Sequence, residues 1–131
     1  MSCWRGSLPA TPEAGPILRN ALAAMARECG LGEQRVSDVK LAVTEAVTNV
    51  IRHAYDRQKP GDVTATADVR AGTLRIVIAD TGRGMASRSD KPGLGLGLPL
   101  IARLADAIEV ISKSPGTEIH MTFACPASPG G

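Results

Sequence analysis

The stretch LAVTEAVTNVIRHAYD, residues 41–56, decides the expected fold because it combines two patterns. Its apolar residues recur at helical spacing, which predicts one buried face of a helix over residues 33–55. Three polar residues, Glu45, Asn49 and His53, follow at intervals of four and therefore form one row beside that face. A carboxylate held against apolar groups costs free energy unless it is paired or used. An amphipathic helix edge with incidental polar residues explains this stretch, taken alone, at least as well.

The remaining hydrophobic patterns predict the other elements of the chain. The predicted helices are residues 12–28, 33–55 and 98–106. The predicted strands are residues 4–10, 63–70, 73–80, 107–113 and 117–124. Their order predicts an α+β fold, a two-layer sandwich with helices packed on one face of a mixed, mainly antiparallel sheet. Residues 1–125 are expected to form a single domain, and residues 126–131 a disordered tail.

The composition excludes several classes of protein. The chain has 131 residues, 44% of them hydrophobic, and only three aromatic residues, so its core must be aliphatic. A net charge of +2 without a basic block, together with few aromatic rings for base stacking, argues against direct nucleic-acid binding. No apolar run approaches the ~20 residues needed to span a bilayer, so we expect no membrane association and a cytoplasmic location. The three cysteines are far apart in sequence and indicate neither a disulfide framework nor a zinc site.

The stretch IVIADTGRGM, residues 76–85, ends an apolar strand in a carboxylate. Asp80 could accept a hydrogen bond from an exocyclic amine such as that of adenine, whereas guanine would present an oxygen there. Gly82 and Gly84 could adopt positive φ and let the backbone approach a flat ring closely. An ordinary turn that begins with aspartate is the alternative for this stretch alone.

The stretch GLGLGLPLIARLAD, residues 93–106, places alternating glycines before a helix. Such a segment can present several N–H groups to phosphates at the helix amino terminus. It is not a Walker A loop, and Leu98 stands where a dinucleotide-binding fingerprint needs its third glycine. A flexible linker is the alternative, although the intervening leucines disfavour it. In SPGTEI, residues 114–119, the Thr117 hydroxyl could reach a base or its bound water, although a simple turn explains that segment as well.

In this order and spacing, the four features resemble the ATP site of the GHKL superfamily, which includes gyrase and the histidine kinases. EAVTNVIRHAY resembles its N box, DTGRG and GLGLGL its two glycine boxes, and GT its adenine-proximal threonine. The closest resemblance is to the bacterial anti-sigma-factor serine kinases. It implies the Bergerat-type version of the two-layer sandwich.

The resemblance also implies roles for individual residues. Glu45 would be the catalytic general base, Asn49 would bind Mg²⁺, and Asp80 would accept the adenine amino group. His53 is expected to be a hydrogen-bonding residue at the helix edge. The other nucleotide-binding residues that the resemblance implies are Gly82, Gly84, Met85, Gly93, Leu94, Gly95, Leu96, Gly97, Leu98 and Thr117.

The function that the resemblance implies is that of an ATP- and Mg²⁺-dependent serine-protein kinase and anti-sigma factor. Such a kinase phosphorylates an anti-anti-sigma protein with a STAS domain, sequesters a sigma factor, and is commonly a homodimer. One alternative is a noncatalytic, ATP-dependent regulator that only binds a partner, although the presence of both Glu45 and Asn49 argues against it. The other is a stand-alone ATP domain of histidine-kinase type, for which the sequence offers no phosphoacceptor helix.

Overall fold

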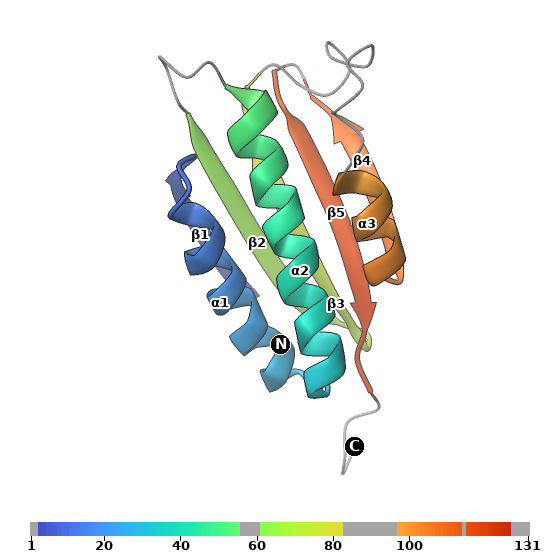
Figure 1. Cartoon of the computed structure of the whole chain (residues 1–131). Coiled ribbons are helices and arrows are strands. Elements are labelled where there is room, and N and C mark those ends of the chain that lie inside the picture. Colours follow the sequence, from blue (N-terminus) through green and yellow to red (C-terminus); the bar gives the residue numbers. More distant parts are fainter. Residues whose placement is uncertain (1–2, 56–60, 83–96, 114, 127–131) are drawn as a thin grey trace.

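The computed structural model describes residues 3–55, 61–82, 97–113 and 115–126. The helices are α1 (Ala14–Glu28), α2 (Glu33–Asn49), η1 (Val50–Ala54) and α3 (Gly97–Leu104). The strands are β1 (Cys3–Pro9), β2 (Asp62–Arg70), β3 (Thr73–Asp80), β4 (Ala107–Ser112) and β5 (Thr117–Ala124). Helices α1, α2 and α3 cover one face of the sheet (Figure 1). The predicted α+β sandwich is therefore confirmed.

The five strands form one sheet in the order β1-β2-β3-β5-β4, and all four pairings are antiparallel. The sheet is thus antiparallel throughout its described pairings rather than mixed. Strands β3 and β4 do run in the same direction, because helix α3 returns the chain between them. Strand β5 turns back after β4 and lies between them, so the two parallel strands never become neighbours.

The core lies between the sheet and the helices. Alternate residues of the three central strands are buried, as expected when one face of a sheet is covered. These residues are Val63, Ala65, Ala67, Leu74, Ile76, Ile78, Ile119, Met121 and Phe123. Helix α2 faces them with alanines and valines, including Ala46 and Val47, which are both fully buried. The core is therefore almost wholly aliphatic, as the composition predicts.

The long helix changes its geometry at its carboxyl end. Helix α2 ends at Asn49 and continues as a five-residue π-helix, η1, before Tyr55 adopts extended backbone angles. The row expected from the sequence therefore holds for Glu45 and Asn49, whereas His53 lies within the π turn, where the four-residue spacing no longer applies. Single π turns of this kind occur frequently at functional sites.

Candidate nucleotide site

The candidate site begins where strands β3 and β5 meet. Asp80 is the last residue of β3 and pairs directly with Thr117, the first residue of β5. By strand alternation Asp80 continues the buried row that ends in Ile78, and its other cross-strand neighbour, Val63, is fully buried. Thr117 is only 3% exposed. Register therefore brings the two expected adenine-contacting residues together on the helix-covered face.

The Asp80 carboxylate is oriented by the backbone that follows it. The Gly82 N–H donates a hydrogen bond to Asp80 Oδ1 over 2.9 Å. A bond from a backbone N–H to a carboxylate is charge-assisted and stronger than a neutral one. The chain after β3 thus holds the carboxylate in a defined direction at the end of its strand.

Two glycines keep the backbone around Asp80 close-packed. A Cβ atom at Gly82 would collide with the carbonyl oxygen of Ala54 in η1, and one at Gly116 would collide with the carbonyl oxygen of Asp80. Gly116 also has a φ of +104°, whereas Gly82 is not among the described glycines with positive φ. The expectation of positive φ at Gly82 is therefore wrong: close packing against the helix end demands a glycine there.

Tyr55 is a further positioning residue, and sequence reasoning missed it. Its hydroxyl donates to the carbonyl oxygen of Asp62 over 2.7 Å and accepts the Thr81 N–H over 2.9 Å. The side chain therefore ties the end of η1 to the start of β2 and to the residue after Asp80. The sequence did hold a signal for this role, because Tyr55 is one of only three aromatic residues and follows the polar row of the long helix.

Asn49 has a buried amide with an unsatisfied donor. The residue is 9% exposed, and its Nδ2 atom is one of two buried side-chain polar atoms without a hydrogen-bond partner among the described residues. An unsatisfied buried polar group costs about 1–3 kcal/mol.

The Asn49 amide offers one oxygen and two N–H groups, so it suits both a magnesium ion and a phosphate oxygen. Magnesium in nucleotide sites needs few protein ligands, because phosphates and waters supply the others. Asn49 therefore fits the group that the family resemblance implies.

Glu45 lies one helical turn before Asn49 on α2 and is half-buried. The α-helical spacing places both side chains on the same face of the helix. His53 is also half-buried, but it belongs to η1 and not to this pair.

The phosphate side of the expected site is partly described. Gly97 is the first residue of α3, and Leu98 packs partly buried against the core. The amino terminus of α3 is thus anchored by an apolar side chain directly after the last glycine. The expected nucleotide-binding residues that lie outside the described residues are Gly84, Met85, Gly93, Leu94, Gly95 and Leu96.

Arg35 fixes the other end of α3. Its Nη1 atom donates to the carbonyl oxygen of Leu104 and to Asp38, each over 2.8 Å. Its Nη2 atom contacts Asp106 at 3.1 Å, and its guanidinium lies 5.3 Å from the centre of the Phe123 ring. A cation at the carboxyl end of a helix satisfies terminal carbonyl groups and complements the helix dipole. Arg35 therefore holds α3 against α2, which sequence reasoning did not foresee.

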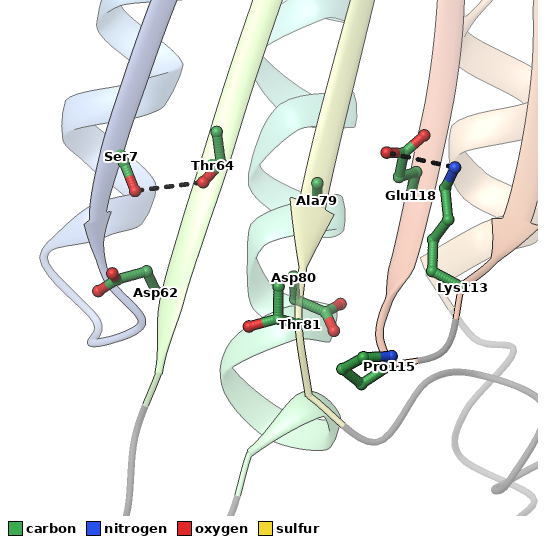
Figure 2. A pocket seen from close by; sticks show the side chains of 9 residues that line it. All are labelled: Ser7, Asp62, Thr64, Ala79, Asp80, Thr81, Lys113, Pro115 and Glu118. Atoms are coloured by element: carbon green, nitrogen blue, oxygen red, sulfur yellow. Dashed lines mark hydrogen bonds and ion pairs between the residues drawn. The ribbon is translucent and has the colours of Figure 1, made fainter.

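A separate cavity of ≈ 270 Å³ lies at the same end of the sheet. Figure 2 views it across the strands with α2 behind them, so most of its lining comes from the face turned away from the helices. On one side of the cavity, the hydroxyl groups of Ser7 and Thr64 are hydrogen-bonded to each other over 3.1 Å. On the other side, Lys113 and Glu118 form an ion pair of 4.0 Å. Asp80 borders this cavity too, although the register places Asp80 beside Thr117 in the helix-side row.

Comparison with known proteins agrees with this geometry. Residues 8–123 match the model of the histidine kinase-like ATPase domain. The serine-protein kinase RsbW of Bacillus licheniformis is 33% identical over 87% of this chain and 80% of its own length. The RsbW kinases of Bacillus subtilis and Staphylococcus aureus are 32% and 30% identical, each over 88% of this chain and 81% and 82% of their own lengths.

A solved structure shares the fold. The RsbU and RsbW domains of a Mycobacterium tuberculosis protein superpose with a TM-score of 0.76 at 21% identity, covering 95% of this chain and 33% of that one. The chain therefore belongs to the histidine kinase-like ATPase family and, within it, to the group of the serine-protein kinases. Among the described residues, no helix is both long and apolar enough to cross a membrane.

Proposed function

We propose that this chain transfers the γ-phosphoryl group of ATP to a serine of a partner protein. The observation that carries the proposal is the buried Asn49 amide, whose Nδ2 has no partner within the described residues and which lies one helical turn from Glu45. Native proteins leave few buried polar groups without a partner, so an unsatisfied amide beside a carboxylate favours a binding role over an incidental helix edge. The kinship with serine-protein kinases supports the same reading.

The adenine end of the site rests on Asp80 and Thr117. The Asp80 carboxylate, held through Oδ1 by the Gly82 N–H, would accept the exocyclic amine of adenine. Guanine places a carbonyl oxygen at that position, which a carboxylate repels. Thr117 lies directly opposite on β5, so its hydroxyl would complete the contacts to the base.

The phosphate end of the site rests on Asn49 and Glu45. Bound ATP would supply the phosphoryl group, and Mg²⁺ would neutralise charge on its phosphates. The Asn49 side-chain oxygen would ligate the metal, and its N–H groups would be available to a phosphate oxygen. Glu45 would accept the proton of the serine hydroxyl as that oxygen attacks. The glycine segment before α3, ending at Gly97, would wrap the phosphates.

The partners follow from the family resemblance. The acceptor would be a serine of a small anti-anti-sigma protein with a STAS domain, and the same chain would bind and sequester a sigma factor. We propose a homodimer as the active form and the cytoplasm as its location.

The direct test is phosphoryl transfer. The purified chain is incubated with γ-labelled ATP, Mg²⁺ and each STAS-domain protein of the same genome. We expect acid-stable label on a serine of one of them. Binding of ATP and partner without any transfer would instead favour the noncatalytic regulator. An acid-labile label on histidine would favour the histidine-kinase alternative.

A further inference from the structure

Two cysteines that are 96 positions apart in sequence contact each other where α1 and β5 end. Cys125 Sγ lies 3.1 Å from Cys29 Sγ, and Cys29 Sγ in turn donates to the carbonyl oxygen of Ala26 over 3.2 Å. Cys29 directly follows α1, and Cys125 directly follows β5. Both are free thiols and half-buried, whereas Cys3 is exposed at the start of β1. The contact therefore joins the helix layer to the sheet.

The backbones of both cysteines are already held in place. The Cys29 N–H donates to the carbonyl oxygen of Met25 over 3.1 Å, and the Cys125 N–H donates to that of Gly72 over 2.8 Å. The segments that follow lie close together, because a Cβ atom added at Gly30 would lie 3.3 Å from the ring of Pro126. The two sulfur atoms need to approach by only about 1 Å to reach bonding distance, a shift that side-chain rotation can supply.

We propose that Cys29 and Cys125 form a reversible thiol–disulfide site, which a low-molecular-weight disulfide oxidises to an intramolecular bond. The inference does not depend on the proposed kinase activity. Disulfides that form in reducing compartments are usually transient and serve catalysis or redox sensing. The wide sequence separation of the two cysteines concealed the pair from sequence reasoning.

The exchange proceeds in two balanced steps. In the first, the Cys125 thiolate attacks the external disulfide RSSR, forms a mixed disulfide and releases one thiolate, RS⁻. In the second, Cys29 loses its proton and attacks the Cys125 sulfur, which releases a second RS⁻. The protein loses two hydrogens, and RSSR becomes two RSH.

The surroundings of Cys29 make the second step depend on pH. Burial and, after it, the neighbouring Cys125 raise the pKa of the Cys29 thiol to about 12. The contributions of Cys125, a hydrogen bond and then its charge, disappear once that sulfur is in the mixed disulfide, but the burial remains. Cys29 therefore stays largely protonated near neutrality, and ring closure should accelerate as the pH rises.

Bond formation would stabilise the fold. The closed loop would run from the end of α1 to the end of β5, and long loops lose the most chain entropy in the unfolded state. The bond would also fasten α1 to the carboxyl end of β5, whereas Thr117 lies at the opposite end of that strand.

The experiment uses the full chain in the Cys3→Ser background, which removes the exposed thiol, and oxidised glutathione as the probe. We expect intact mass to show a loss of two hydrogens, and peptide mapping to join the peptides of Cys29 and Cys125. Thermal unfolding should shift upward by roughly 5 to 20 °C, reversibly on adding dithiothreitol. The rate of ring closure should rise between pH 7 and pH 9.

Matched controls add Cys29→Ser or Cys125→Ser to the same background, and neither should gain the shift. Because a serine variant can fail to fold, the peptide map of the parent protein decides the outcome by itself. Recovery of both thiols unmodified, or accumulation of stable glutathione adducts without the internal bond, would overturn the proposal.

Discussion

Asp80 and Thr117 face each other across β3 and β5, and the Gly82 N–H holds the Asp80 carboxylate through Oδ1. This pairing joins two residues that lie 37 positions apart in the sequence. It forms because β5 inserts beside β3 instead of continuing outward from β4. The carboxylate and the hydroxyl thereby share one end of the helix-covered face, where an adenine ring would need both.

Asp80→Asn should weaken ATP binding and relax discrimination against GTP, because the amide can offer an N–H group to the guanine carbonyl. The loss of one charge-assisted hydrogen bond should cost roughly 1.5 to 3 kcal/mol of binding free energy. Titration calorimetry with both nucleotides measures the effect. Asp62→Asn is the matched control, since this exposed carboxylate starts β2 and should leave ATP affinity unchanged. Equal ATP affinity of Asp80→Asn and the parent protein would sink the adenine assignment.

Asn49→Leu should separate stability from nucleotide binding. The leucine has a similar shape and removes an unsatisfied buried amide, so the free energy of unfolding should stay equal or rise by about 1 kcal/mol. The dependence of ATP affinity on Mg²⁺ should be lost, because the proposed ligand oxygen is gone. Urea denaturation and calorimetry with and without Mg²⁺ measure the two effects. Asn20→Leu, at an exposed position of α1, should leave the Mg²⁺ dependence intact. A normal Mg²⁺ dependence in Asn49→Leu would refute the ligand role.

Glu45→Gln should bind ATP normally but transfer the phosphoryl group slowly. The substitution keeps size and helix propensity and removes only the basic oxygen, so transfer should fall by about 10²- to 10⁴-fold. This corresponds to roughly 3 to 5 kcal/mol of activation free energy. Single-turnover kinetics must use the cognate protein substrate, because hydrolysis without it reports attack by water. Transfer at the parent rate would show that another group is the base.

Tyr55→Phe should loosen the end of β3. It removes the hydroxyl that accepts the Thr81 N–H and donates to the Asp62 carbonyl oxygen. We expect a loss of about 1 to 3 kcal/mol in the free energy of unfolding, since both backbone groups lose a partner. ATP affinity should fall as well, because Thr81 directly follows Asp80. Urea denaturation and nucleotide titration measure both effects, and unchanged ATP affinity would limit Tyr55 to a role in stability.

Local patterns in the sequence predicted the helices and strands to within a few residues, with the long helix as the instructive case. Apolar residues at helical spacing located α2, and alternation located β2, β3 and β5, because each periodicity reflects one covered face. The row of Glu45 and Asn49 followed from the same rule. The π turn after Asn49 was not predictable in this way, since apolar residues at helical spacing predict only a regular α-helix.

The sequence by itself therefore determined the elements, the covered faces and the candidate polar residues, which depend on neighbours within a few positions. Only the tertiary structure decided which of them meet. The insertion of β5 beside β3 pairs Asp80 with Thr117, Arg35 reaches across to the end of α3, and Cys29 touches Cys125. These contacts join residues far apart along the chain, and no local periodicity encodes them. They result from the close packing of the helix layer on the sheet. The order of the strands and the way the helices cross them decide which distant side chains come into contact.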